Sequence, residues 1–439
     1  MREALGTPES VFSWAESFTN LEKGAPPPDK RVFRLDRMRS LLAMFGDPHN
    51  GLRIVHVAGT KGKGSTSTLI ACVLQAAGRR TGLYTSPHVH SAMERIQVPG
   101  EPPREDLIVK LGKAVKAAIN ARPAEGWPGH SAPTTFELLT LLAFLYFRDA
   151  GCTDAVVEVG IGGRLDATNV VRPEACVITP LDLEHTDVLG DTLEKIAFEK
   201  AGIIKPGAPV FIGLQTAAAR KVFRQVCGEC GAPGTFLDEE MQEIATRVDE
   251  HGTSFTLRLK GEQPVDFRLS LVGEFQAENA ALAYLALRHT RPEILLSHFR
   301  EGFGSATLPG RMEVRGGAPV IVLDGAHTPL AVTRLLETFS KVWPGDSILL
   351  FGSVSGKRPK EMADILAPAF KSIIISTPGT FKESNPQEVA EIFRGRNPAT
   401  ILEKDPRKAL QLALEESAGR VPILVTGSFY MVSEVRKLL

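Results

Sequence analysis

The sequence predicts an α/β protein with two domains. Short apolar runs alternate with longer helix-like stretches along most of its 439 residues, and strands that alternate with helices form parallel sheets covered by helices. A chain of this length has room for two or three domains. We therefore expect a mostly parallel sheet and a small antiparallel ribbon over residues 1–307, followed by a smaller Rossmann-like α/β domain over residues 308–439.

The strands of the first domain are short apolar runs bounded by turn residues. They are expected at residues 53–57, 81–84, 154–159, 175–179 and 209–212. Helical periodicity predicts helices at residues 65–77, 134–149, 192–201 and 275–287. Residues 254–260 and 265–271 instead alternate polar and apolar side chains, which is typical of an antiparallel ribbon with one face in water.

The second domain repeats the alternation of strands and helices. Its strands are expected at residues 319–323, 347–351, 372–376 and 421–425. Its helices are expected at residues 329–339, 359–367, 386–394, 406–416 and 430–438. No G-x-G-x-x-G follows the first of these strands, so the domain is expected to lack a dinucleotide-binding fingerprint.

Composition narrows the classes of function. Lys and Arg number 51, as do Asp and Glu, so the net charge of zero argues against a nucleic-acid partner. The most apolar stretch, residues 136–147, is too short to cross a membrane. Residues 1–20 lack the apolar core of a signal peptide, and five cysteines do not suggest a disulfide framework. We expect a cytoplasmic protein with no membrane partner.

A glycine-rich turn between the first strand and the next helix is the strongest motif. It comprises Gly59, Thr60, Lys61, Gly62, Lys63, Gly64, Ser65 and Thr66. Glycines let backbone N–H groups face phosphate oxygens at a helix N-terminus, and Lys63 can reach the β- and γ-phosphates. Ser65 or Thr66 can cap the helix or contact phosphate or Mg²⁺. The first domain is therefore expected to be P-loop ATPase-like. Gly64 separates Lys63 from the hydroxyl residue, unlike a strict P-loop, and a turn without a ligand is the alternative.

Further motifs follow the loop in a fixed order. They are Tyr84-Thr85-Ser86-Pro87-His88, Glu94-Arg95-Ile96, Thr135-Phe136-Glu137, the run from Glu158 to Asn169, His185-Thr186-Asp187, Glu199-Lys200-Ala201-Gly202, Asn279-Ala280-Ala281, Pro309-Gly310-Arg311, Asp324-Gly325-Ala326-His327 and Thr426-Gly427-Ser428. With the loop, this series resembles the folylpolyglutamate synthase/dihydrofolate synthase family of the Mur ligase superfamily over nearly the whole chain.

The resemblance implies a monomeric, ATP-dependent amide ligase, which we expect to be a bifunctional dihydrofolate/folylpolyglutamate synthase. ATP phosphorylates a carboxylate of dihydropteroate or of a folate, and the amine of L-glutamate attacks the acyl phosphate, releasing ADP and phosphate. Two alternatives remain open. One is another Mur-type ligase acting on a cell-wall precursor, and the other is a switch that hydrolyses ATP without ligation.

The resemblance also implies a metal site. Ser86, Glu158 and His185 are expected as Mg²⁺ ligands, and Lys200 is expected to be carbamylated, which requires a neutral amine with a depressed pKa. Taken without the family, Glu158 could cap a helix or pair with Arg164. On the same terms His185 could be an ordinary loop histidine and Lys200 an exposed helical lysine.

The remaining expected site residues are grouped by the ligand that they would bind or the role that they would have. Asn279, Arg311 and Asp324 match ATP contacts of the family, while Phe136 and Asp166 match its pterin contacts. His327 is expected, with Lys63 and Lys200, to act in catalysis. The alternatives are a helix cap for Asn279, a surface ion pair for Arg311, turns for Asp324 and Asp166, core packing for Phe136 and a helix N-terminal histidine for His327.

At three positions this sequence has a residue other than the one usual in the family. Lys61 replaces the usual Asn, Glu184 replaces the common Asp before His185, and Thr328 replaces the usual Asn. Lys61 adds a positive charge beside the expected phosphate site or extends into solvent.

Overall fold

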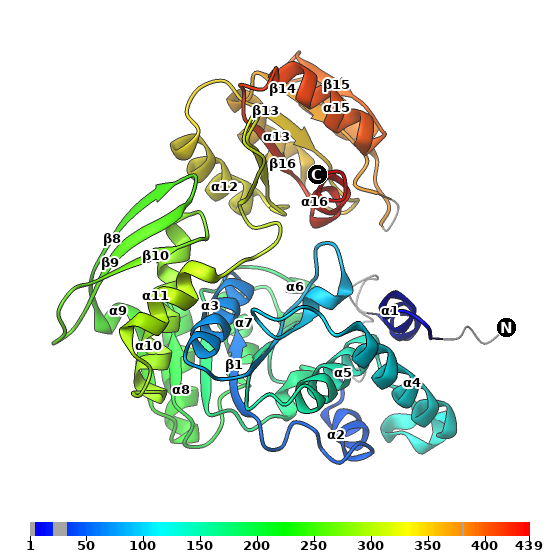
Figure 1. Cartoon of the computed structure of the whole chain (residues 1–439), viewed down its shortest axis with the longest axis vertical. Helices are drawn as coiled ribbons and strands as arrows, with labels where there is room; N and C mark the ends of the chain where they lie inside the picture. The colour runs from blue at the N-terminus through cyan, green and yellow to red at the C-terminus, as the bar shows by residue number, and fades with distance from the viewer. Residues whose placement is uncertain (1–4, 21–32, 380–381) are drawn as a thin grey trace.

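The computed structural model describes residues 5–20, 33–379 and 382–439. Figure 1 shows a larger lobe built from the N-terminal two thirds of the chain and a smaller lobe built from the C-terminal third. Each lobe contains its own mostly parallel sheet, so the predicted α/β class is confirmed. The predicted boundary at residues 307 and 308 lies between the last helix of the larger lobe and the first strand of the smaller one, and it stays a prediction.

The sheet of the larger lobe has seven strands in the order β3-β2-β4-β1-β5-β6-β7. Its strands are β1 (Arg53–Ala58), β2 (Thr81–Tyr84), β3 (Ile96–Gln97), β4 (Asp154–Glu158), β5 (Ala175–Ile178), β6 (Val210–Ile212) and β7 (Gly234–Phe236). Only β3 runs antiparallel to its neighbour. The central strand β1 lies between β4 and β5, so the carboxyl ends of these three strands meet at one edge, where open α/β sheets bind ligands.

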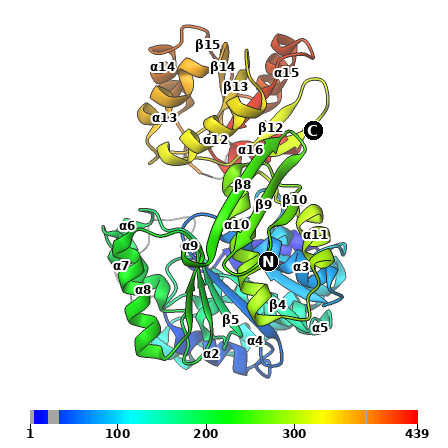
Figure 2. The same cartoon turned by 90° about the vertical axis from the view of Figure 1, so that its left-hand side faces the viewer.

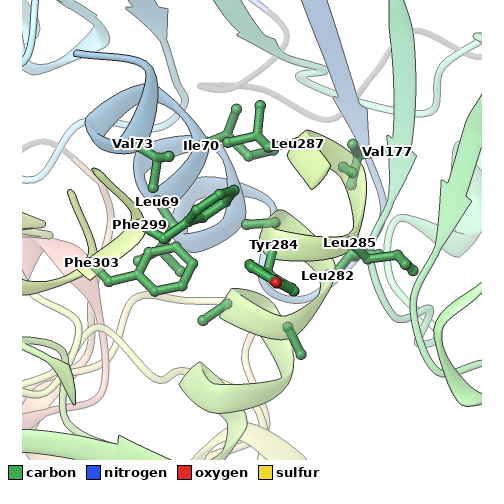
Figure 3. Packing of buried hydrophobic residues seen from close by; sticks show 14 of the residues in the cluster. Leu69, Ile70, Val73, Val177, Leu282, Tyr284, Leu285, Leu287, Phe299 and Phe303 are labelled. Carbon is green, nitrogen blue, oxygen red and sulfur yellow. The ribbon is translucent and has the colours of Figure 1, made fainter. Parts of the chain in front are cut away.

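Helices cover both faces of this sheet. They are α1 (Pro8–Glu16), α2 (Leu35–Ala43), α3 (Lys63–Ala76), α4 (Glu105–Ala121), α5 (Thr135–Asp149), α6 (Thr186–Leu189), α7 (Leu193–Ala201), α8 (Ala217–Cys230), α9 (Leu237–Glu240), α10 (Glu274–Thr290) and α11 (Leu296–Ser305). Successive strand residues serve opposite faces, since Val55 packs with α3 and α10 whereas Ile54 packs with α5. Figure 3 shows the first core, in which Leu69 and Val73 of α3 meet Tyr284 of α10 and Phe299 of α11.

The antiparallel ribbon has three strands, one more than predicted. They are β8 (Met241–Asp249), β9 (Gly252–Leu259) and β10 (Val265–Leu269), paired in the order β10-β9-β8. Phe255 and Phe267 stack in the core of the larger lobe, with ring centroids 5.2 Å apart. Val248 of β8 packs instead against the core of the smaller lobe, and Figure 2 shows the ribbon rising from one lobe to the other.

The smaller lobe contains a six-stranded sheet in the order β11-β12-β16-β13-β14-β15. Its strands are β11 (Glu313–Arg315), β12 (Ile321–Leu323), β13 (Ile348–Phe351), β14 (Ser372–Ile375), β15 (Thr400–Leu402) and β16 (Ile423–Thr426). Its helices are α12 (Pro329–Val342), α13 (Pro359–Leu366), α14 (Pro386–Arg394), α15 (Pro406–Ser417) and α16 (Phe429–Arg436). Strand β11 is antiparallel and the other strands are parallel. Across the described parts of both lobes, no helix is long and apolar enough to cross a membrane.

Candidate active site

The glycine-rich loop joins β1 to α3 and leaves no space for side chains at two of its glycines. Gly59 has φ +143°, and a Cβ there would lie 1.8 Å from Oγ1 of Thr179. Gly62 has φ +86°, and a Cβ there would lie 2.3 Å from Oδ1 of Asn279. Both positions therefore require glycine. The loop is fixed to the neighbouring strand end because the N–H groups of Thr60 and Lys61 each donate to the Pro180 carbonyl at 3.1 Å.

The helix after the loop begins earlier than predicted. Gly62 is the N-cap residue of α3, and no side chain caps the helix, so the prediction that Ser65 or Thr66 caps it was wrong. Both residues lie inside the first turn, where Thr66 Oγ1 donates to Asn279 Oδ1 at 3.5 Å. The first N–H groups of a helix have no intrahelical acceptor. Without a side-chain cap, those of α3 suit an anion.

Glu158, Ser86 and Lys63 meet where β4 ends beside the loop. Oε2 of Glu158 accepts a hydrogen bond of 3.0 Å from the Ser86 N–H, and Oε1 lies 4.0 Å from Nζ of Lys63. The Glu158 side chain is only 3% exposed. Burial raises its pKa, and Lys63 acts in the opposite direction. The alternative of a pair with Arg164 is wrong, because the Arg164 guanidinium instead lies over the Phe198 ring.

Lys200 is buried at the end of α7, with 4% exposure. Burial and, to a smaller extent, the charge of Lys63 lower its pKa to about 7. The negative charges of Glu184, Asp166 and Glu158 raise the pKa of Lys200 and so oppose this shift. The alternative of an exposed helical lysine is therefore wrong, and a large fraction of the amine is neutral near pH 7.

His185 begins the short helix α6 with φ +54°. Burial lowers its pKa, although Glu184 opposes this shift, which favours the neutral imidazole that a metal ion requires. The expected metal ligands are a hydroxyl, a buried carboxylate and an imidazole. The Ser86 N–H binds Glu158, and Lys63 acts electrostatically on both Glu158 and His185. The expected ligands fit a divalent cation, which would compensate the buried charge of Glu158. No group of three or more His, Cys, Asp and Glu side chains placed for a metal occurs among the described residues, and the expected set contributes only Glu158 and His185 of these types.

The smaller lobe supplies Asp324 and Arg311 to the same region. The buried Asp324 carboxylate accepts hydrogen bonds from the N–H groups of Met312 at 2.9 Å and Ala326 at 2.8 Å, as the turn alternative requires. Burial raises its pKa, and Arg311 opposes that shift. Arg311 also acts electrostatically on Glu158 of the other lobe, and its guanidinium lies 4.4 Å from the centre of the Phe429 ring. A simple surface ion pair does not describe this arginine.

Asn279 reaches the loop from α10. It is 5% exposed, and its amide donates to Oε1 of Gln276 at 3.0 Å while its Oδ1 lies against Gly62. The alternative of a helix cap is wrong because α10 begins at Glu274, five positions earlier. Asn279 instead links α10 to the start of α3.

His327 lies at the turn before α12 and faces the larger lobe. Its Nδ1 is 2.8 Å from the Gly325 carbonyl. A carbonyl only accepts, so Nδ1 carries the proton and Nε2 is the acceptor. Burial lowers the His327 pKa to about 4, and Lys357 acts in the same direction. Two charges of the larger lobe also act on the pKa of His327, which Glu184 raises and Lys61 lowers.

The surroundings of two lysines, where the two lobes meet, were not predicted. Lys61 does not extend into solvent, because its Nζ lies 3.3 Å from Oε2 of Glu184; two departures from the family pattern therefore pair with each other. Lys357, in the loop after β13, faces Glu184 and Lys61. A Gly-Lys pair after a strand at the carboxyl edge was the only sequence signal for it.

A pocket beside this cluster contains both expected pterin residues. It is lined by Thr19, Asn20, Phe33, Arg34, Thr134, Thr135, Phe136, Glu137, Leu139, Gly160, Ile161, Leu165, Asp166 and Ala167. The Phe136 ring lies 5.9 Å from that of Tyr84, and a Cβ at Gly160 would come within 2.6 Å of it. Asp166 accepts from the N–H groups of Gly160 and Ile161 at 3.1 Å, and Thr168 donates twice more. Asp166 therefore both lines the pocket and caps the local turn.

Comparison with known proteins identifies the class and then the family. Residues 57–287 match the Mur ligase middle domain, and residues 310–429 match the Mur ligase glutamate ligase domain. The dihydrofolate synthase/folylpolyglutamate synthase of Bacillus subtilis is 33% identical over 92% of this chain and 94% of that protein. A probable bifunctional folylpolyglutamate synthase/dihydropteroate synthase of Haloferax volcanii is 34% identical over 91% of this chain, which spans only 48% of that protein.

A solved structure agrees with the sequence comparison. Escherichia coli FolC in complex with DHPP and ADP superposes with a TM-score of 0.82 at 26% identity, covering 100% of this chain and 99% of FolC. The fold and the two matched domains define a Mur ligase. The chain belongs to the folylpolyglutamate synthase/dihydrofolate synthase family, whose members are ATP-dependent ligases.

Proposed function

We propose that this protein joins L-glutamate to dihydropteroate, to the γ-carboxylate of a tetrahydrofolate, or to both, with ATP as the source of energy. One observation carries the proposal. Strand β4 ends at Glu158 beside the glycine-rich loop, and Gly160, two residues later, lines the apolar pocket. A substrate whose ring lies in the pocket can therefore extend its carboxylate toward phosphates held by the loop.

In the first step, a substrate carboxylate oxygen attacks the γ-phosphorus of ATP and ADP leaves, giving an acyl phosphate. The N-terminus of α3 and Lys63 are proposed to bind the phosphates and to neutralise the charge that develops on them. Asn279, Arg311 and Asp324 are proposed ATP contacts, with Arg311 acting from the smaller lobe. Solved structures of relatives with ADP or AMPPCP, such as FolC with ADP, support ATP as the ligand.

Ser86, Glu158 and His185 would hold Mg²⁺. A bound Mg²⁺ supplies charge neutralisation and orientation of the phosphate oxygens. Lys200 is proposed to react with CO₂ through its neutral amine, forming an N–C bond and losing a proton. The resulting carbamate would be an anion on which the positive charge of Lys63 acts favourably.

In the second step, the amine of L-glutamate attacks the acyl carbon and phosphate leaves. We assign residues 308–439 as the glutamate ligase domain and residues 1–307 as the ATP-binding domain. The match of residues 310–429 to that domain of the Mur ligases supports the assignment. Nε2 of His327 can accept a hydrogen bond from the attacking amine because its Nδ1 already donates to Gly325.

Phosphate release with Mg-ATP and L-glutamate tests the proposal, with dihydropteroate and tetrahydrofolate offered separately. Incorporation of glutamate with dihydropteroate alone identifies a dihydrofolate synthase, and incorporation with tetrahydrofolate alone identifies a polyglutamylating enzyme. Incorporation with both identifies a bifunctional enzyme, which we expect. ATP hydrolysis that is independent of glutamate and incorporates neither pterin would overturn the ligase proposal in favour of a switch.

The proposal includes a monomer that works in the cytoplasm. All five cysteines are unpaired thiols, which suits a reducing compartment. Light scattering on the purified protein tests the monomer, and a stable dimer at micromolar concentration would contradict it.

A further inference from the structure

The loop after β2 is organised by one carboxylate. Glu94 accepts hydrogen bonds from the N–H groups of Val89 at 2.7 Å, His90 at 3.2 Å and Ser91 at 3.3 Å. The N–H of Thr85 donates to the Arg95 carbonyl at 3.1 Å, which closes the base of the loop. These hydrogen bonds tie residues 86–95 together, and the loop begins with Ser86, whose N–H binds Glu158.

The last helix of the chain reaches this loop from the other lobe. The Arg436 guanidinium places Nη1 3.6 Å from Oε1 of Glu94 and Nε 3.1 Å from Oε1 of Glu313. The three side chains are only 21%, 17% and 12% exposed, respectively. We call this arrangement of Glu94, Arg436 and Glu313 the Arg436 bridge. It spans the two lobes, because Glu94 belongs to the larger lobe and the other two residues to the smaller one.

The bridge also holds the segment that carries Arg311. Oε2 of Glu313 accepts a hydrogen bond of 2.8 Å from the Gly310 N–H, and Arg315 donates to Oε1 at 2.7 Å. Residues 310–313 thus form a short turn closed by the same carboxylate that binds Arg436. Arg311 lies inside this turn.

Apolar contacts follow the same path across the lobes. Val89 of the loop packs against the core cluster that contains Val432 of α16. A Cβ at Gly310, where φ is +63°, would lie 3.1 Å from Val432 and 3.2 Å from Val89. The loop, the turn and α16 therefore meet at one point with no spare volume.

We propose that Arg436 is a positioning residue that fixes Arg311 relative to Ser86. The inference rests on the proposed function, in which Arg311 contacts ATP and Ser86 belongs to the metal site. Arg436 is not one of the proposed contacts of ATP or the metal. Its two ion pairs join the turn carrying Arg311 to the loop carrying Ser86, so its loss would leave each group intact but free to separate.

The experiment compares wild type with Arg436→Gln, Arg436→Lys, Glu94→Gln and the double variant Glu94→Gln/Arg436→Gln. Glutamine at position 94 removes the charge while its amide oxygen can still accept from the Val89 N–H. Lys437→Gln is the matched control, since Lys437 is the next residue and pairs only locally with Glu434 at 2.7 Å. The readouts are the affinity for AMPPCP with Mg²⁺ by calorimetry, the KM values for ATP and pterin, kcat, and Tm.

We expect Arg436→Gln to weaken AMPPCP binding and to raise the KM for ATP by about three- to tenfold, with the KM for pterin unchanged. Arg436→Lys should recover part of the loss, because one ammonium cannot serve two carboxylates as a guanidinium fork does. Glu94→Gln should resemble Arg436→Gln, and the double variant should lose little more. Lys437→Gln should match wild type.

Unchanged AMPPCP affinity in a folded Arg436→Gln or Glu94→Gln protein would overturn the inference. So would additive losses in the double variant, or an equal rise in the KM values for ATP and pterin. If Arg436→Gln does not fold, Arg436→Lys and Glu94→Gln decide the matter by the same criteria. AMPPCP binding needs neither pterin nor glutamate, so a wild-type protein that binds AMPPCP but ligates nothing would contradict the proposed function and leave the inference standing.

Discussion

The ammonium nitrogen of Lys63 lies 4.0 Å from a carboxylate oxygen of Glu158. Lys63 opens α3 after β1, and Glu158 ends the adjacent strand β4. Their meeting is a direct result of parallel pairing, in which Val57 of β1 aligns with Glu158. Because Glu158 is buried, its negative charge depends on cations nearby.

Glu158→Gln should lower kcat by about 100-fold or more, because it removes the anionic member of the proposed metal site. It should not lower Tm, since a neutral amide avoids the desolvation of a buried carboxylate. Activity measured across a Mg²⁺ titration checks the prediction, with the exposed Glu337→Gln as control. Wild-type kcat at every Mg²⁺ concentration would contradict a role for Glu158 at the metal.

Lys200→Met should abolish most ligation, and added bicarbonate should not restore it, because the variant has no amine to carbamylate. Lys195→Met is the control: Lys195 lies on the same helix but forms an exposed ion pair with Asp191. The measurement is glutamate incorporation in buffer with and without bicarbonate. Full incorporation by Lys200→Met would exclude the carbamate role.

The lowered pKa of Lys200 predicts that the stability of the protein depends on pH. In the folded protein the pKa of Lys200 is about 7, against 10.5 for an ordinary lysine. Between these values the unfolded chain binds more protons, so stability rises with pH and is lost as pH falls toward 7. In bicarbonate-free buffer, the free energy of unfolding of wild type relative to Lys200→Met should increase by on the order of 3 kcal/mol from pH 7 to 9.5. A difference that does not change with pH would contradict the depressed pKa.

Gly62→Ala should weaken nucleotide binding, because the new Cβ would displace Asn279 from the loop. Gly78→Ala is a matched control: its φ is +76°, close to the +86° of Gly62, but open space surrounds it. Both variants should lose about 1 kcal/mol of stability from the left-handed backbone. Only Gly62→Ala should change the affinity for AMPPCP, as measured by calorimetry. Equal affinities in the two variants would show that the loop tolerates a side chain there.

Phe136→Ala should raise the KM for the pterin substrate about tenfold, since a ring wall of the pocket is lost. The affinity for nucleotide should stay the same, because Phe136 does not contact the loop. Phe198→Ala, which removes a half-exposed ring outside the pocket, is the control. A parallel change in pterin and nucleotide affinity would indicate a core role for Phe136 rather than substrate binding.

Elements with strong local signals were predictable. Strand β2 and helix α14 have the predicted bounds, because turn residues delimit the first and Asn385 with Pro386 starts the second. Helices α2 and α4 were not predicted, and the N-cap residue of each is an arginine that makes no capping hydrogen bond with its side chain. Strand β8 was missed because its residues are mostly exposed or half-buried and show little apolar alternation. Pairing with β9 makes it a strand, and pairing is not a local property.

The sequence alone determined the α/β class, the glycine loop and the identity of the candidate residues, because periodicity and short motifs are local. Tertiary structure decided which of these residues meet. It buried Lys200 next to Lys63, paired Lys61 with Glu184 and brought Arg436 from the last helix to Glu94. These relationships join residues more than 100 positions apart, and charges so far apart in sequence interact only because the fold brings them close together in space.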